Sequence, residues 1–241
     1  MQEINVITKD NVRIAANLFN NGRHDNVLII LPGWFMTKDS KPFLDISKEL
    51  SKITDVITVD FRGHGKSSGF YTFTAKEIND INAIVNFSKN LYKKIYIMGF
   101  SLGASLSLLY GAENSAINKI IAVSPACDFN KIENHFWKKE AWLPTLKKAE
   151  LKRWCSIRPS IHIQKKTKPI NVIEKVNCPT LFIAGENDPT VFPWHTEELF
   201  KKAVCIKKYE LFKDCIHAED LFLQEPAKFI DICTKWLKET K

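Results

Sequence analysis

Long hydrophobic runs are missing from this sequence. No stretch approaches the ~18 to 20 consecutive apolar residues that a membrane-spanning helix needs. The first residues, from Met1 to Val6, have neither the basic region nor the apolar core of an export signal. We therefore expect a cytoplasmic protein with no stable membrane insertion.

The chain also lacks paired cysteines. Its six cysteines are scattered, with no C-x-x-C pair among them. Such a distribution argues against a metal cage and against a disulfide framework, so we interpret them as reduced, buried thiols and expect no metal site. They are Cys127, Cys155, Cys178, Cys205, Cys215 and Cys233.

Internal repeats, linkers and low-complexity tracts are absent too, which favours one compact unit. The 241 residues are 45% hydrophobic and 11% aromatic, enough to build a large core. The formal net charge of +8 would suit a nucleic-acid partner, but its distribution argues against one. Residues 131–168 hold nine Lys and two Arg against three Glu, and the rest of the chain is balanced.

The apolar pattern predicts alternating strands and helices. Continuous apolar runs such as 27–31 and 120–123 are typical of strands buried on both faces of a parallel sheet. Amphipathic spacing between the runs predicts helices. The expected strands are 3–8, 12–19, 27–31, 56–59, 95–98, 120–123, 180–184 and 205–211, and the expected helices are 43–50, 75–88, 195–202 and 226–238. This order predicts an α/β fold with a mostly parallel, doubly wound sheet of about eight strands.

One interval breaks the alternation. Residues 127–176 are too many for a crossover loop, and too basic and aromatic for core. We interpret them as a helical cap inserted into a core made of residues 1–126 and 177–241. The basic residues could attract an anionic group, or they could form a solvated face with tryptophans packed on the core.

A G-x-S-x-G motif stands where a strand turns abruptly into a helix. Ser101 lies on this turn, between Gly99 and Gly103. A serine lifted above a strand end is strained, and its neighbours two residues away must pass close to other backbone. The helix that follows points its free N–H groups toward the space beside the serine, and Leu102 N–H is the nearest donor. A Gly-flanked serine in an ordinary loop is the alternative interpretation.

Two further strand ends supply partners for a nucleophilic serine. A serine hydroxyl needs a base, and an imidazole base needs a carboxylate to orient it. His217 follows the last expected strand, and Asp188 follows the strand at 180–184. Taken singly, Asp188 could be a turn or cap residue and His217 a surface histidine. Asp128, after the preceding strand, is a second candidate for the acid.

Taken together, these segments resemble the α/β-hydrolase superfamily over nearly the whole chain. Gly99 to Gly103 resembles its nucleophile elbow, Asp60 to Ser67 the loop after the fourth strand, Gly185 to Asp188 the acid loop, and Cys215 to His217 the histidine loop. The resemblance implies an oxyanion hole from the backbone N–H groups of Trp34 and Leu102. Pro32 stands where the family usually has histidine, which raises the question of how this loop is braced.

Within the superfamily, the length and short cap resemble small bacterial esterases of the monoglyceride-lipase, cinnamoyl or feruloyl esterase and serine-aminopeptidase-like branch. The expected activity is a carboxylesterase-type, lipase-like serine hydrolase without a cofactor, acting on a small-molecule ester, anionic or aromatic. Peptide or thioester hydrolysis, including lysophospholipase activity, and non-catalytic binding of a small molecule remain open. Candidate substrate-binding residues are Phe35, Phe136, Trp137, Trp142 and Trp154.

Overall fold

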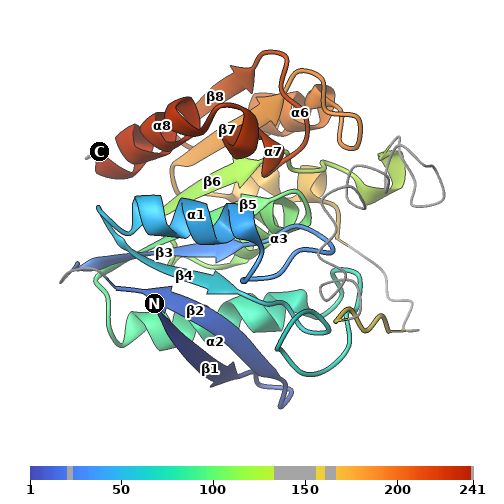
Figure 1. Ribbon diagram of the computed structural model, residues 1–241. Coiled ribbons are helices and arrows are strands. Elements are labelled where there is room, and N and C mark those ends of the chain that lie inside the picture. Colours follow the sequence, from blue (N-terminus) through green and yellow to red (C-terminus); the bar gives the residue numbers. More distant parts are fainter. Residues whose placement is uncertain (21–23, 133–155, 161–166, 240–241) are drawn as a thin grey trace.

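The computed structural model describes residues 1–20, 24–132, 156–160 and 167–239, and its centre is an eight-stranded sheet (Figure 1). The strand order is β1-β2-β4-β3-β5-β6-β7-β8. The strands are β1 (Gln2–Ile7), β2 (Arg13–Phe19), β3 (Asn26–Leu31), β4 (Asp55–Val59), β5 (Lys94–Phe100), β6 (Lys119–Val123), β7 (Thr180–Gly185) and β8 (Lys207–Phe212). Strand β2 runs antiparallel to both of its neighbours, β1 and β4, and every other pair of neighbouring strands is parallel. The prediction of a mostly parallel sheet is confirmed.

Helices cover both faces of this sheet, as its buried central strands require. The helices are α1 (Lys41–Leu50), α2 (Glu77–Lys89), α3 (Leu102–Glu113), α6 (Pro193–Lys202), α7 (Asp220–Gln224) and α8 (Pro226–Lys238). The core on one face is built with residues of α1, α7 and α8, and the core on the other with residues of α2, α3 and α6. The sequence pattern predicted all of these helices except the short α7. None of the helices in the described ranges is both long and apolar enough to cross a bilayer.

The insertion between β6 and β7 is described at its two ends and over residues 156–160. Its ends contain the short 3-10 helices η1 (Phe129–Lys131), η2 (Pro169–Asn171) and η3 (Ile173–Lys175). They are joined where Ile170 N–H donates to the carbonyl of Cys127 at 3.1 Å, and where Lys168 and Asp128 form an ion pair at 2.8 Å. Most of the predicted cap lies outside the described residues, and so do Phe136, Trp137, Trp142 and Trp154.

Candidate active site

Ser101 occupies the turn between β5 and α3 in a strained backbone conformation. Its φ is 51° and its ψ is −111°, a combination that non-glycine residues seldom adopt. The backbone is anchored on the next strand, because Ser101 N–H donates to the carbonyl of Val123 at 2.8 Å. Strain of this kind persists only where the surrounding structure over-determines it, and here it lifts the hydroxyl above the sheet edge.

The two glycines of the motif make this turn sterically possible. A Cβ on Gly99 would lie 2.3 Å from the carbonyl oxygen of Gly103. A Cβ on Gly103 would lie 2.1 Å from the carbonyl oxygen of Leu31, at the end of β3. The first helical turn therefore packs directly against the strands, which the G-x-S-x-G spacing predicted.

Three side chains form a continuous hydrogen-bonded series at this edge of the sheet. The Oγ of Ser101 lies 2.8 Å from Nε2 of His217. Nδ1 of the same imidazole lies 2.6 Å from Oδ2 of Asp188. The structure thus brings together the three residues that the sequence assigned as nucleophile, base and acid.

The Asp188 carboxylate is held in place by the loop that carries it. Its Oδ1 accepts the backbone N–H groups of Thr190 and Val191, both at 2.9 Å. The side chain is almost fully buried, so its charge acts on His217 without screening by water. The carboxylate therefore fixes both the orientation and the tautomer of the imidazole, which is the arrangement a general base needs.

The pKa of His217 is raised above the usual histidine value. Burial of the ring acts to lower the pKa, but the Asp188 carboxylate, with smaller contributions from Glu219 and Asp220, outweighs burial. The side chain is still 19% exposed, so solvent or substrate can reach the site. An imidazole with a raised pKa is a stronger base toward the Ser101 hydroxyl.

Asp128 is not brought to the imidazole. Its Oδ2 accepts from Lys168 Nζ at 2.8 Å, and its Oδ1 accepts from the backbone N–H of Asn130 at 3.0 Å. The second candidate acid thus caps η1 and joins the ends of the insertion. The carboxylate after β7, and not the one after β6, is hydrogen-bonded to His217.

The backbone donors that the resemblance implies lie on either side of Ser101. Gly33 follows β3, and a Cβ on this glycine would lie 3.4 Å from the Cβ of Ser101. Trp34 is the next residue along the chain. Leu102 begins α3, where an N–H has no intrahelical acceptor. Within the described ranges, no backbone acceptor is bonded to Trp34 N–H. This geometry fits a pocket for a negative oxygen beside the serine.

Comparisons with known proteins agree with this geometry. A family model for the alpha/beta hydrolase fold matches residues 26–144. The solved esterase Pf2001 of Pyrococcus furiosus is 26% identical, with 98% of this chain and 89% of that chain covered and a TM-score of 0.80. This chain has the α/β-hydrolase fold.

Three further proteins resemble this chain. The esterase RhEst1 of Rhodococcus sp. ECU1013 shares 14% identity at a TM-score of 0.83, with both chains fully covered. Est1E of Butyrivibrio proteoclasticus, solved with ferulic acid, shares 19% identity over 97% of this chain and 99% of that chain, at a TM-score of 0.71. The uncharacterized protein YqkD of Bacillus subtilis is 28% identical over 188 residues, which is 74% of this chain and 61% of the relative. The chain thus spans about three fifths of that curated relative.

Two buried histidines lie outside the hydrogen-bonded series of Ser101, His217 and Asp188. His64 Nδ1 is 3.2 Å from the carbonyl of Arg62, and burial lowers its pKa to about 4. His195 stacks on Trp194 with ring centroids 3.8 Å apart, and its Nδ1 lies 3.0 Å from Sγ of Cys127. Both therefore pack the interior. The cysteines of the described ranges are free thiols, and no cluster of metal-ligating side chains is found there.

Ser124 is a site residue that the sequence analysis missed. It follows β6 directly with a φ of 51°, and its Oγ accepts the backbone N–H of Ala218, the residue after His217, at 3.1 Å. The histidine loop is thereby attached to the strand beside the nucleophile. A serine at the end of a predicted strand is the only signal, and that signal is weak.

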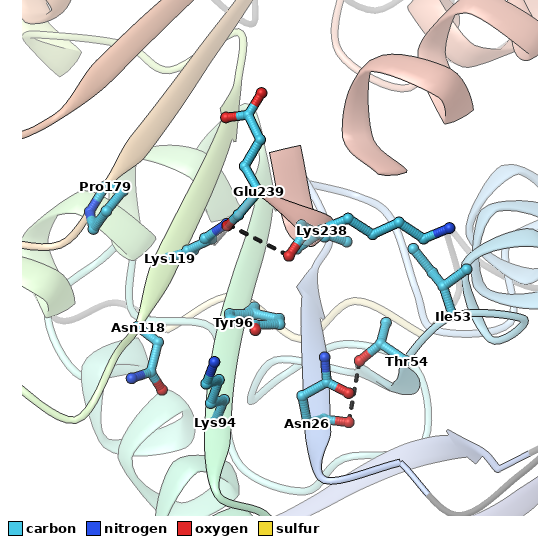
Figure 2. Close-up of a pocket in the computed structure, with 11 residues that line it drawn as sticks. Asn26, Ile53, Thr54, Lys94, Tyr96, Asn118, Lys119, Pro179, Lys238 and Glu239 are labelled. Carbon is cyan, nitrogen blue, oxygen red and sulfur yellow. Dashed lines mark hydrogen bonds between the residues drawn. The ribbon is translucent and has the colours of Figure 1, made fainter. Parts of the chain in front are cut away.

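A cavity of about 370 Å³ lies at the opposite end of the sheet, and Figure 2 shows the residues that line it. It is bordered by Asn26, Lys94 and Asn118 at strand beginnings, and by Glu239 after α8. Lys119 reaches across it to donate to the carbonyls of Trp236 and Glu239, each at 2.5 Å. None of the residues with roles in the hydrogen-bonded series lines this cavity, so it is separate from the candidate active site.

Proposed function

We propose that the protein is a carboxylesterase-type serine hydrolase, with Ser101 as nucleophile, His217 as base, and Asp188 as the acid that orients His217. The observation that carries the proposal is the unbroken pair of hydrogen bonds, 2.6 and 2.8 Å, leading to a serine in a left-handed conformation. The esterase activity named for several solved neighbours supports ester hydrolysis over other acyl transfers. Peptide and thioester cleavage would use the same three residues.

The mechanism follows from the positions of these groups. Ser101 Oγ attacks the ester carbonyl carbon while His217 Nε2 takes the hydroxyl proton, and Asp188 stabilises the imidazolium that forms. The N–H groups of Trp34 and Leu102 donate to the tetrahedral oxyanion, each contributing about 3 kcal/mol to the lowering of the barrier. His217 then protonates the leaving alcohol, and an acyl group stays on Ser101. Water repeats the two steps and releases the acid.

We extend the proposal to substrates with a small or medium acyl or aryl group. Phe35, whose ring centroid lies 4.3 Å from that of Trp34, supplies an aromatic surface next to the oxyanion loop. Solved relatives were obtained with ferulic acid and with malate, which are small carboxylic acids of the kind that ester hydrolysis releases. A cytoplasmic location and substrate contacts by the insertion remain predictions from the sequence.

The test is covalent labelling with an alkyl fluorophosphonate, followed by intact-mass detection of the adduct. We expect one adduct on the wild type, none on Ser101→Ala, and strongly slowed labelling on His217→Ala. His24→Ala is the matched control, because His24 lies outside the site, and it should label like the wild type. Turnover of p-nitrophenyl esters should follow the labelling. A folded wild-type protein that forms no adduct would refute the proposal and favour a non-catalytic small-molecule binder.

A further inference from the structure

The loop that carries Trp34 has an unusual start. Pro32 has no N–H to donate and its ring forms no hydrogen bonds, so its side chain cannot tie the loop to its surroundings as a histidine could. The far end of the loop is fixed, since Lys38 N–H donates to the buried Asp60 carboxylate at 2.6 Å. Between these points Phe35 has a φ of 63°, which a bulky residue holds only under constraint. Met36 N–H donates to the Gly33 carbonyl at 3.2 Å and closes a turn over Trp34 and Phe35, and contacts of the Trp34 ring fix this turn against its surroundings.

Aromatic packing supplies these contacts. The Trp34 ring lies 6.2 Å from the rings of both Tyr71 and Phe73, centroid to centroid. Tyr71 in turn lies 4.6 Å from Phe73 and 4.9 Å from the neutral ring of His64. We call Trp34, His64, Tyr71 and Phe73 the aromatic brace. Tyr71 touches the other three members and is only 3% exposed, so it is the centre of the group.

Tyr71 is held by a short piece of the insertion, residues 156–160, which we call the strap. The backbone N–H of Tyr71 donates to the carbonyl of Arg158 at 2.8 Å, and the carbonyl of Tyr71 accepts from Ser160 N–H at 2.7 Å. Tyr71 and Pro159 therefore pair as a parallel bridge. The strap is therefore joined to the loop after β4 by an isolated β-bridge.

The Arg158 side chain also binds the loop after β4. Its guanidinium donates to the carbonyl of Ser156 at 2.8 Å, to that of Gly69 at 3.3 Å, and to that of Ser67. Its backbone N–H donates to the carbonyl of Gly63 at 2.8 Å. One arginine thus connects the strap to points on the loop before Tyr71, and its planar fork of donors suits several fixed acceptors at once.

The end of the loop after Tyr71 is also under constraint. Phe73 and Thr74 have φ values of 53° and 79°. The buried carboxylate of Glu77 accepts the backbone N–H of Thr72 at 2.6 Å and its hydroxyl at 2.8 Å. Strained residues keep their conformation only when neighbours fix them, so the strap on one side and Glu77 on the other set where the Tyr71 ring lies.

We propose that Arg158 and Tyr71 are positioning residues for the oxyanion donor: the strap fixes Tyr71, Tyr71 fixes the Trp34 ring, and the Trp34 N–H is thereby held toward the reacting oxygen. The proposal rests on the proposed function. A donor contributes to catalysis in proportion to how well it is oriented before the reaction, and a displacement of about 1 Å is enough to lose most of that contribution.

Tyr71→Ala and Arg158→Ala are the variants that test the proposal. Because the oxyanion forms only in the transition state, kcat should fall roughly 10- to 100-fold with KM nearly unchanged. Tyr71→Phe keeps the ring and should restore kcat to near the wild-type value. Arg13→Ala, at an exposed arginine on β2, is the matched control and should leave kcat unchanged.

Two readouts separate positioning from damage to the fold. First, kcat is normalised to the sites titrated by fluorophosphonate, so that an unfolded fraction does not lower it. Second, binding of a trifluoromethyl ketone, whose adduct with Ser101 carries an oxyanion, should weaken in parallel with kcat, while binding of the carboxylic acid product should not change. A melting temperature for each variant completes the set.

The outcomes are distinct. A fall in normalised kcat with parallel loss of ketone affinity in Tyr71→Ala, restored in Tyr71→Phe, supports the proposal. Equal normalised kcat in the wild type, Tyr71→Ala and Arg158→Ala overturns it while leaving the proposed function intact. If Tyr71→Ala does not fold, Arg158→Ala decides the question by the same measurements. Failure of the wild type to label would refute the proposed function first, and the positioning role with it.

Discussion

The two ends of the central sheet differ in backbone strain. Eight non-glycine residues in the described ranges have positive φ, and all of them lie at the carboxyl end of the parallel strands. Asn11 is in the β1–β2 turn, which is next to the end of β4. The other seven are in segments that follow parallel strands: Phe35, Phe73, Thr74, Ser101, Ser124, Asp214 and Ala218. Each such residue costs about 1 to 3 kcal/mol.

The amino end of the sheet carries the cavity of Figure 2, and no described non-glycine residue there has a positive φ. Lys119 at this end donates to the carbonyls at the end of α8, which is a common way for a lysine to cap a helix. The comparison teaches that in this fold a site is marked by residues forced into costly conformations and by aligned donors and acceptors. The cavity of about 370 Å³ at the other end has no residue of positive φ on its described border.

The largest expected effect at the strained end is loss of the acid. Asp188→Asn should lower kcat about 10⁴-fold, because an amide stabilises the wrong tautomer of His217 and cannot balance the imidazolium charge. Asp128→Asn, at the carboxylate paired with Lys168, should change kcat only a few-fold. Steady-state kinetics on an ester substrate measure both. Equal losses in the two variants would contradict the assignment of Asp188.

Close packing under the elbow predicts the next largest effect. Gly103→Ala places a methyl group against the main chain of β3, which cannot yield, so the free energy of unfolding should fall by at least about 3 kcal/mol. Gly111→Ala is the control on the same helix, because its new Cβ would meet only the flexible Cδ1 of Ile120, at 2.6 Å. The better helix propensity of alanine, about 1 kcal/mol, offsets that contact. Urea denaturation compares the two, and similar losses would mean that the backbone contact is unimportant.

The pH profile gives a smaller and more specific effect. His217 must be neutral to accept the serine proton, so kcat/KM falls as the pH drops through its pKa. Because that pKa is raised, the acid limb should lie above 6.5. Glu219→Gln removes one of the charges that raise the pKa and should move the limb to lower pH. Glu186→Gln, on the acid loop, should leave it in place. A limb below 6.5 in the wild type would show that the charges around His217 do not outweigh its burial.

The smallest effect is expected at the amino end. Lys94→Ala alters the border of the cavity and should leave kcat/KM within about twofold and stability within about 0.5 kcal/mol, as for most surface substitutions. The same kinetic and denaturation measurements apply. A large loss of activity would show that the two ends of the sheet are coupled, and the contrast between them would no longer hold.

Much of this architecture could be predicted from sequence because its signals are local. The buried strands are short apolar runs, and the closing helix at 226–238 has amphipathic spacing and begins at a proline, which favours the first turn. Ser101, Asp188 and His217 could be chosen because parallel strands end at one edge and each residue follows a different strand.

What could not be predicted depends on contacts between distant segments. The five-residue α7 is too short for a periodic signal. The role of Asp128 depends on Lys168, forty residues later, and nothing local distinguishes a capping carboxylate from a catalytic one. The aromatic brace joins the loops after β3 and β4, and its central residue, Tyr71, is hydrogen-bonded to a segment almost ninety residues further along the chain. Such pairings leave no periodicity in the sequence.

The strand pairing between Tyr71 and Pro159 has a consequence for protein engineering. Insertions of this kind are attractive to exchange between relatives, on the assumption that they carry substrate selectivity and leave the chemistry alone. Here the exchanged piece would include residues whose main chain and guanidinium are bonded to the core. A chimera that omits Arg158 and Pro159 should therefore change its turnover rate together with its selectivity, whereas one that keeps them should change selectivity alone.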